Sequence, residues 1–410
     1  MDAVEPSPHD PAKAYACILR YQLGDWKPYI YKTTDYGKSW TLITTGDNGI
    51  PADYPVRVVR EDPEVEGMLF AGTEYGVFAS MDDGETWKSF QQNMPVTPIT
   101  DMKITRGDLV LSTMGRGFWV VDNLVSLRQM ANGDTGDLVL YTPKNTIRYR
   151  SPSGSRNSQT PKYPQPSVSI DYVLPDSLDG PIMLEIVREG GDTIVQMISD
   201  TSATSVPDQI IENMATSRTE WIIDKSLRVK PGLNRYNWDM SMPGPWHRTE
   251  SRRYQNGPMA LPGNYTVILT ANDTKLSENF MLKMDPRSND SVNQSDLEEQ
   301  VSLQQSVSEL LSDARKMEKF VEENMDKIKK TEKDYADHPS YKHFQMIKSA
   351  LQTKKGIYEK PMLTAQLSYL YNMLGDADQK PGKDAHTRFG QLESEFNRIE
   401  GLMKSGPSSN

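Results

Sequence analysis

The chain has 410 residues, with 56 acidic against 46 basic side chains and a formal net charge of −10. This balance argues against nucleic acid as a partner, because binding to the phosphate backbone depends on Lys and Arg. The length favours two to four domains, and no apolar run approaches the roughly 18 residues that a membrane span needs. The single cysteine, Cys17, excludes an intrachain disulfide framework, and its apolar neighbours predict a buried packing role.

One short pattern, Ser/Thr-x-Asp-x-Gly-x-Ser/Thr-Trp, occurs twice in the N-terminal part, at residues 33–40 and 80–87. Each copy follows an apolar and aromatic stretch, so we expect each to form the turn of a β-hairpin. In such a turn Gly supplies a positive φ angle and the Asp side chain bonds the turn amides. The pattern therefore predicts a structural role for six residues: Asp35, Gly37, Trp40, Asp82, Gly84 and Trp87.

The Asp of the second copy follows that of the first by 47 residues. A repeat of 40 to 50 residues is typical of one blade of about four strands in a β-propeller. A third, weaker copy at residues 100–123 lacks the motif, as terminal repeats often do. Residues 1–128 are therefore predicted to form a partial β-propeller with two complete blades and a terminal half blade.

A propeller ring needs at least four blades, so the sequence is interpreted as a fragment. The missing N-terminal blades would complete the ring. The first residues show no basic region, apolar core or cleavage site, so we also expect any export signal to lie in the missing part rather than in this fragment.

The character of the sequence changes between residues 136 and 287, where short strand-like runs alternate with turn residues. This pattern favours an Ig-like β-sandwich. A polar loop near residues 246–256 begins with Trp246, His247 and Arg248, which could hold an anionic or sugar ligand by stacking and hydrogen bonding. The alternative is a solvated insertion whose Trp packs on the sandwich.

From residue 291 to residue 404 the apolar residues recur mostly every three or four positions, which predicts four amphipathic helices. A capping box at 295–298 would open the first helix, which we expect to end near residue 330. His338 and Pro339 interrupt the pattern, and Pro361 can open the third helix. The segment is predicted to be a C-terminal helical bundle.

The repeated motif is the Asp-box, and it resembles the BNR-repeat propellers of sialidases, xyloglucanases and sortilin-type receptors. The order of Asp-box blades, the run at 112–122, an Ig-like module and the run at 360–371 is similar to the C-terminal part of large bacterial BNR or sortilin-like repeat proteins. That resemblance covers nearly the whole chain. Such proteins are commonly labelled glycosyl hydrolases, a label that follows the propeller rather than a demonstrated reaction.

Glycoside hydrolysis needs two carboxyl groups about 5 to 10 Å apart. Asp35 and Asp82 are poor candidates, because the Asp-box lies at the outer side of a blade. A sialidase would also need an arginine cluster, for which Arg116 is the most interesting candidate, with Trp119 beside it as a further ligand-binding residue. Three other arginines of the repeats are also available: Arg57, Arg60 and Arg106. The five histidines share no ligand spacing, so neither a metal site nor a cofactor is predicted.

The predicted fold class is mainly β plus α: a partial Asp-box propeller, an Ig-like sandwich and a C-terminal helical bundle. The preferred function is an accessory C-terminal region of a secreted or periplasmic BNR-repeat protein that binds a polysaccharide or a protein partner. The alternative is a glycoside hydrolase of the sialidase or xyloglucanase type, whose catalytic carboxylates lie in the missing N-terminal blades. Whether the protein is an enzyme is left open by the sequence.

Overall fold

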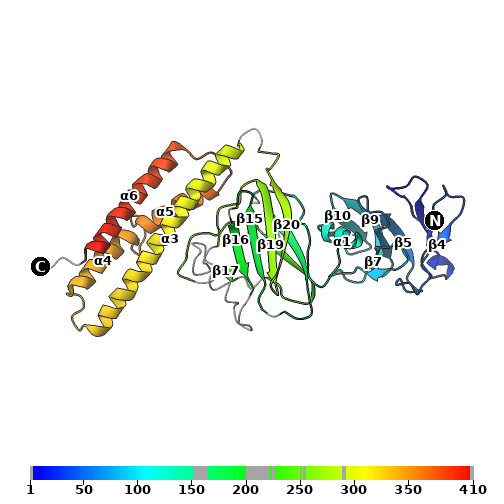
Figure 1. The fold of residues 1–410 in the computed structure, drawn as a ribbon, viewed down its shortest axis with the longest axis horizontal. Helices are drawn as coiled ribbons and strands as arrows, with labels where there is room; N and C mark the ends of the chain where they lie inside the picture. The colour runs from blue at the N-terminus through cyan, green and yellow to red at the C-terminus, as the bar shows by residue number, and fades with distance from the viewer. Residues whose placement is uncertain are drawn as a thin grey trace. The chain divides into compact units, whose positions relative to one another are not determined.

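A computed structural model describes residues 3–150, 165–178, 180–191, 193–199, 222–223, 227–249, 252, 255–288 and 292–406. The chain divides into two compact units. The N-terminal unit comprises Met1–Lys144 with Asp171–Asp176 and Lys230–Asn234, and the C-terminal unit comprises Asn145–Ile170, Ser177–Val229 and Arg235–Asn410. The protein is a mixed α/β chain of several small sheets and helices (Figure 1).

The N-terminal unit contains two antiparallel sheets of four strands each. The first has the order β1 (Ala3–Pro6), β2 (Ala14–Cys17), β3 (Ile30–Thr33) and β4 (Thr41–Leu42). The second has the order β5 (Val56–Glu61), β6 (Leu69–Thr73), β7 (Gly76–Ser80) and β8 (Lys88–Ser89). Residues 33–40 and 80–87 thus join the third strand of each sheet to its fourth.

A third antiparallel sheet contains β9 (Ile99–Thr105), β10 (Asp108–Thr113) and β11 (Phe118–Val121), followed by helix α1 (Val125–Ala131). The turn at 113–117 joins the second strand to the third, so it corresponds to the turn between β6 and β7 rather than to an Asp-box. Helix α1 follows β11 at the position where the Asp-box, residues 80–87, follows β7 in the second sheet. The amide of Leu124 bonds the carbonyl of Gly107 at 2.8 Å, as the amide of Asp83 bonds Gly67 at 2.9 Å.

The first strands of the three sheets are neighbours, since β1 contacts β5 and β5 contacts β9. Two apolar cores lie among the described residues of these three sheets. One combines residues of the first and second sheets: Tyr15, Cys17, Ile30, Ile43, Ile50, Val56, Val59, Leu69, Ala71, Phe78 and Trp87. The other combines the second and third sheets with residues at and before α1: Val58, Val65, Met68, Phe70, Val77, Ala79, Met94, Ile99, Met102, Leu109, Leu111 and Leu124. The buried position of Cys17 confirms its predicted packing role.

The largest sheet has six strands in the order β13, β20, β19, β15, β16 and β17. Their bounds are Thr146–Ile147, Thr274–Lys283, Gly263–Ala271, Met183–Arg188, Thr193–Ile198 and Ile222–Ile223. A three-stranded sheet has the order β12 (Val139–Leu140), β14 (Val168–Leu174) and β18 (Gly232–Trp238). Trp238 of β18 contacts Tyr265 of β19 and Phe280 of β20, with ring centroids 5.9 and 6.3 Å away.

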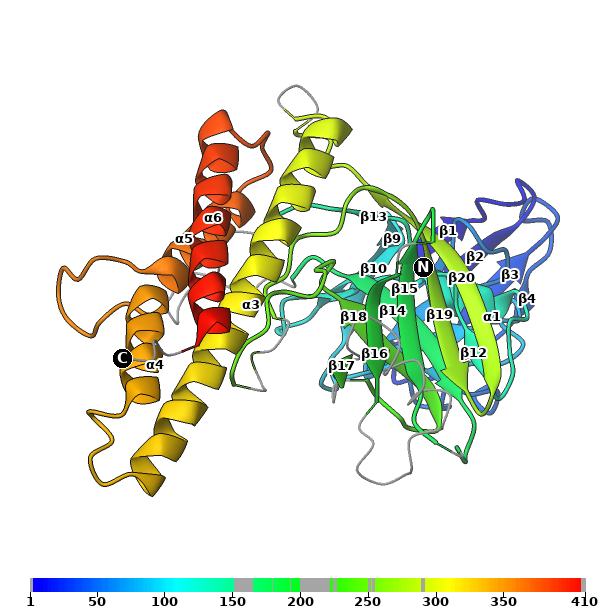
Figure 2. The ribbon, with the colours of Figure 1, turned by 60° about the vertical axis from the view of Figure 1, so that its left-hand side comes forward.

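Four helices follow: α3 (Gln294–Thr331), α4 (Pro339–Leu351), α5 (Leu363–Gly375) and α6 (Lys383–Ser405). They pack on one another around a common apolar core, and Figure 2 shows α6 beside α3 and α5. The capping box is made by Asn293 and Asp296, two residues before the predicted one, because the Asn293 side chain accepts the Asp296 amide at 3.0 Å. None of the helices within the described residues combines the length and apolar character of a transmembrane segment.

The helices are joined to the six-stranded sheet within the same unit. Arg148, which is buried beside β13, donates to Asp378 in the connection between α5 and α6, with Nη2 3.1 Å from Oδ1. Leu261 forms a small apolar cluster with Val292, Leu297 and Val301 at the start of α3. The predicted sandwich and helical segments therefore share both ionic and apolar contacts.

Candidate functional site

The two Asp-box turns are held by the same set of hydrogen bonds. In the first, Asp35 Oδ1 accepts the Thr33 hydroxyl at 2.8 Å and the Ser39 amide at 2.9 Å, while Oδ2 accepts the Ser39 hydroxyl at 2.6 Å. The Gly37 amide donates to the Thr33 hydroxyl oxygen at 3.0 Å. These donors lower the pKa of Asp35 to about 2, led by the two bonds from Ser39.

The second turn repeats this geometry around Asp82. The carboxylate accepts the Ser80 hydroxyl at 2.7 Å, the Thr86 amide at 2.9 Å and the Thr86 hydroxyl at 2.5 Å. Burial raises the pKa of Asp82, but the bonds from Thr86 and Ser80 outweigh it and lower the pKa below its usual value. Gly37 and Gly84 both have positive φ angles, 81° and 89°. Both carboxylates are thus engaged in holding their own turns.

The tryptophans of the two turns have different surroundings. Trp40 is 40% exposed, and its indole Nε1 donates to Gly37 of its own turn at 3.2 Å. Trp87 is only 3% exposed, and its Nε1 lies 3.4 Å from the carbonyl oxygen of Ile43, which follows the last strand of the first sheet. The second Asp-box therefore packs on the preceding sheet.

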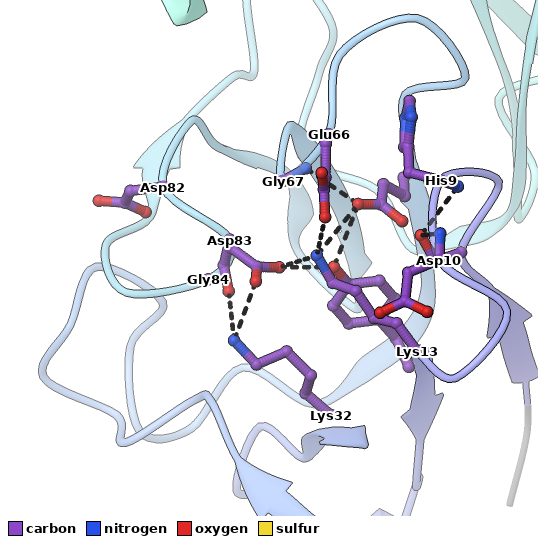
Figure 3. A network of polar contacts seen from close by, with 12 residues as sticks. His9, Asp10, Lys13, Lys32, Glu66, Gly67, Asp82, Asp83 and Gly84 are labelled. Atoms are coloured by element: carbon purple, nitrogen blue, oxygen red, sulfur yellow. Dashed lines mark hydrogen bonds and ion pairs between the residues drawn. The ribbon is translucent and has the colours of Figure 1, made fainter. Parts of the chain in front are cut away.

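A partly buried polar network joins the first and second sheets (Figure 3). Lys13 Nζ lies 3.1 Å from Asp83 Oδ1 and 3.4 Å from Glu61 Oε1. The hydroxyl of Tyr15 donates to Asp83 at 2.5 Å and to Glu61 at 3.3 Å, and Lys32 pairs with Asp83 Oδ2 at 3.1 Å. Figure 3 shows Lys13 and Lys32 pointing toward Asp83. Burial raises the pKa of Asp83, but bonds from Tyr15, Lys13 and Lys32 lower it overall.

This network is closed to a substrate at its centre. Tyr15 is fully buried, and burial together with the Asp83 bond raises the pKa of its hydroxyl far above its usual value. The Glu61 side chain is also fully buried, and its Oε1 accepts the Gly67 amide at 2.9 Å. A tyrosine that is neutral and inaccessible cannot act as a nucleophile at physiological pH. The network can stabilise the junction between sheets, and sequence reasoning missed it because its members lie far apart in the chain.

Three of the arginines of the N-terminal unit occupy separate environments. Arg57 pairs with Glu74, while Arg60 Nη1 bonds Glu5 at 3.0 Å and its Nη2 bonds Asp101 at 2.6 Å. Arg116 is exposed in the turn before β11, where its carbonyl accepts Trp119 Nε1 at 3.1 Å. Arg116 and Trp119 thus lie together, and their proposed ligand contact stays a prediction.

Trp246, His247 and Arg248 lie in a loop beside α3, but each makes a different contact. Trp246 is 8% exposed, its amide donates to the Ser312 hydroxyl at 2.9 Å, and its carbonyl accepts Arg315 Nη1 at 3.1 Å. Its ring is covered, with Lys319 Nζ 5.9 Å from the ring centroid. Arg248 pairs with Glu322 of α3. The continuation of the predicted loop at residues 250, 251, 253 and 254 lies outside the described residues.

A pocket of about 320 Å³ opens between this loop and helices α3 and α5. Its polar lining includes His247 and Arg252 from the loop, Arg315 from α3, and Tyr371 from α5. The remaining lining residues are Pro245, Gln255, Asn256, Leu311, Ser368 and Asn372. No carboxylate belongs to this set of described residues, and the pocket therefore offers hydrogen-bond donors and positive charge.

The helix side of this pocket is held in place by buried contacts. Tyr371 donates its hydroxyl to the carbonyl of Asn256 at 2.7 Å, and burial raises its pKa. Burial lowers the pKa of the Arg315 guanidinium. An arginine side chain nevertheless stays protonated in proteins. Sequence reasoning predicted His247 but missed Arg315 and Tyr371, because both are spaced like ordinary residues of amphipathic helices. Within the described residues, no group of three or more side chains suited to a metal ion occurs.

No family model and no curated protein matches the chain. Among solved structures, it is similar to the GH74 xyloglucanase from Xanthomonas campestris at 12% identity and a TM-score of 0.24, covering 65% of this chain and 42% of that one. It is also similar to the Niastella koreensis GH74 enzyme, at 12% identity and a TM-score of 0.25, covering 68% of this chain and 38% of that one. A third similar structure is the extracellular domain of a putative hybrid two-component system from B. thetaiotaomicron, at 12% identity and a TM-score of 0.20, covering 67% of this chain and 30% of that one.

This chain thus spans less than half the length of each of these structures. At such TM-scores none of the likenesses defines the fold or the function.

Proposed function

We propose that this chain is an accessory, non-catalytic region of an extracytoplasmic repeat protein and that it binds an acidic polysaccharide in the pocket beside α3 and α5. The three N-terminal sheets would be the two blades and half blade of an Asp-box propeller. The six- and three-stranded sheets would form the Ig-like sandwich that carries the binding loop.

The composition of the pocket carries this proposal. Arg252 and Arg315 can bind the carboxylate of a uronic acid, and Gln255, Asn256 and Ser368 can bind sugar hydroxyls. The volume of about 320 Å³ lies at the lower end of the range for small-ligand sites, which suits one or two sugar residues. The chain has a net charge of −10, so its overall electrostatic field would repel a polyanion. Affinity for a polyanion therefore requires a local cationic site.

The same composition argues against hydrolysis in this pocket. Glycosidases of the common type use two carboxyl groups, one as acid and one as base or nucleophile. The described lining of the pocket supplies neither. Asp35 and Asp82 are engaged in their turns, and Glu61 is buried beside Lys13. A catalytic pair in further blades remains the alternative.

Affinity electrophoresis of the full chain tests the proposal, with polygalacturonate as the acidic probe and xyloglucan as the neutral one. Polygalacturonate should retard the protein and xyloglucan should not. Arg252→Ala and Arg315→Ala should each weaken binding about tenfold, which corresponds to about 1.4 kcal/mol. Arg248→Ala is the matched control, because Arg248 belongs to the same loop but pairs with Glu322 and is outside the pocket lining.

Equal retardation by both polysaccharides, or unchanged binding in both pocket variants, would contradict the proposed site. A separate assay for reducing ends addresses catalysis. Release of reducing sugar that is abolished by changing an acidic residue of this chain would show that the chain is an enzyme.

A further inference from the structure

The loop between α4 and α5 carries the two most exposed large apolar side chains among the described residues. Ile357 is 85% exposed, and the neighbouring Tyr358 is fully exposed. Figure 2 shows this loop extending away from the helices. Two adjacent apolar side chains in water leave hydrophobic free energy that a partner surface could gain by covering them.

The base of this loop is closed by hydrogen bonds. The Met362 amide donates to the Thr353 hydroxyl oxygen at 2.9 Å, which joins the two ends of the loop. Gln366 Nε2, from the first turn of α5, donates to the Pro361 carbonyl at 2.7 Å. A surface loop whose ends are joined in this way is a compact element rather than a loose connection.

The tip of the loop, residues 356–359, has a tight turn. A Cβ on Gly356 would lie 2.8 Å from Cγ of Glu359, so the turn requires glycine at this position. Tyr358 has a φ angle of 66°, which is uncommon for a bulky residue. The closed base and the tight tip together hold the side chains of Ile357 and Tyr358 toward solvent.

An apolar groove of about 850 Å³ lies along α5 and α6. Ala365, Tyr369 and Met373 line it from successive turns of α5, and Ala385 lines it from α6. The short side chains of the two alanines leave room between the helices. Because this volume is within the range of small-ligand sites, the groove can take one or two large side chains.

The loop tip and the groove are neighbours on the same chain. Pro361, at the end of the loop, is also part of the groove lining. The bonded base keeps the tip of a chain outside its own groove, as the exposure of Tyr358 shows. A twofold axis between tip and groove would let two copies exchange their tips. Such a contact is self-complementary and closed, as in most symmetric dimers.

We propose that the groove between α5 and α6 binds the loop tip of a second copy of this chain, which gives a symmetric dimer. Tyr358 and Ile357 would fill the space above Ala365 and Ala385, with the ring of Tyr358 against Tyr369. A large aromatic side chain in a pocket is the usual anchor of a protein interface.

The charges at the tip and at the groove are complementary. Lys355 and Glu359 are exposed at the tip, and Asp384 and Arg388 are exposed in the groove lining. Each side thus offers one positive and one negative group, which allows Lys355 to pair with Asp384 and Glu359 with Arg388 across the contact. This arrangement suits a copy of the same chain better than a partner of one charge sign.

The proposed dimer is independent of polysaccharide binding. The loop pocket uses Ser368, Tyr371 and Asn372 of α5, whereas the groove uses Ala365, Tyr369 and Met373, which belong to a different face of that helix. Affinity electrophoresis with polygalacturonate and the dimer measurement below can therefore fail separately.

Sedimentation velocity of the full chain, over a concentration series that extends into the micromolar range, tests the proposal. The average mass should rise from that of the monomer to twice that value. Hydroxyl-radical footprinting over the same series should show oxidation of Tyr358 and Tyr369 falling several-fold. Tyr36, which is 73% exposed in the first Asp-box turn, should keep its oxidation rate.

Two variants test each side of the contact. Tyr358→Asn removes the anchor and should raise the dimer dissociation constant at least tenfold, without strain, because Asn tolerates a positive φ angle. Tyr36→Asn is the matched control, since Tyr36 is an exposed tyrosine with a φ angle of 62°, and it should leave the dimer unchanged. Ala365→Arg fills the groove from an exposed helix position and should also give a monomer with the same helical circular dichroism.

A chain that stays monomeric throughout the concentration series would overturn the proposal. A dimer in which Tyr358 and Tyr369 remain as oxidised as in the monomer would overturn it too, because another surface would then form the contact. Protection of both tyrosines in the monomer would place the tip in the groove of its own chain and would equally contradict the exchange. If Ala365→Arg loses helical structure, the comparison of Tyr358→Asn with Tyr36→Asn decides.

Discussion

The two Asp-box turns are nearly identical in their bonds and opposite in their surroundings. Each carboxylate accepts hydrogen bonds from two hydroxyls and one amide at equivalent positions of its turn. The corresponding distances differ by no more than 0.1 Å. Yet Trp40 is 40% exposed, whereas Trp87 is 3% exposed. The comparison shows that the motif specifies the shape of its turn, while the neighbouring sheet determines whether the turn also belongs to a core.

The residue after the motif aspartate is Tyr36 in the first turn and Asp83 in the second, and it also has different contacts in the two turns. Tyr36 and Asp83 share a positive φ angle, 62° and 58°, so the backbone of the two turns is alike. Asp83 nevertheless receives Lys13, Lys32 and Tyr15 from the first sheet. An identical local conformation thus supports a junction between sheets at one copy and an exposed aromatic side chain at the other.

Replacing the tryptophans should give the largest difference between the copies. Trp87→Ala removes a buried ring from the core and should lower the free energy of unfolding by about 3 to 5 kcal/mol. Trp40→Ala should cost about 1 kcal/mol or less, because much of that ring is already in water. Urea unfolding of both variants measures the difference. Equal losses would mean that burial of the ring does not distinguish the two turns.

Replacing the aspartates should affect both copies. Asp82→Ala leaves the Thr86 amide without its acceptor and should cost about 1 to 3 kcal/mol. Asp35→Ala should lower the melting temperature in the same direction but by less, since the tryptophan of its turn is exposed whereas that of the second turn is buried. Calorimetric melting measures both, and polygalacturonate affinity is the control, which should not change. Lost affinity with unchanged melting would instead assign the turns to the ligand site.

Asn48 should matter only for the second turn. Asn48→Ala removes the bonds to Ile43, Gly84 and Glu85 and should cost about 1 to 2 kcal/mol. It should also increase oxidation of Trp87 in footprinting while leaving that of Trp40 unchanged. Asn93→Ala, at an exposed position after the second sheet, is the matched control. Increased oxidation of both tryptophans would indicate general unfolding of the unit rather than an opened junction.

The smallest expected effect is a dependence on acid pH that both turns share. Asp35 has a pKa of about 2 in the folded chain against a usual 3.8, and the pKa of Asp82 is also lowered. Such groups stabilise the fold above the unfolded pKa and lose that contribution as pH falls through the folded pKa. The melting temperature should therefore decrease from about pH 4 to pH 2. The double variant Asp35→Asn, Asp82→Asn should flatten this decrease.

The exposed Asp53 provides the control for the acid series. Asp53→Asn should leave the slope between pH 4 and pH 2 as in the unmodified chain. If the double variant keeps the same slope, the Asp-box carboxylates do not account for the acid sensitivity of the N-terminal unit.

Features that depend on neighbouring residues could be predicted from the sequence. The turn chemistry of Asp35 and Asp82 requires only residues within four positions of each aspartate, so the motif was sufficient to place their bonds. The apolar period likewise predicted a long helix ending near residue 330, and α3 ends at Thr331. Its start was misplaced by two residues, because Ser295 and Asn293 both precede suitable acidic residues and only the backbone conformation selects between them.

What the tertiary structure decided depends on residues that are far apart in the chain. Lys13 and Asp83 are ordinary charged residues in their own segments, and only the packing of the first sheet on the second makes them partners. His247 was predicted as a ligand-binding residue, but Arg315 joins it only because the loop folds against α3. The hydrogen bonds within a turn depend on a few consecutive residues, so a short sequence motif is enough to predict them. Burial and long-range pairing result from many weak contacts between distant segments, and the sequence alone does not specify which of them meet.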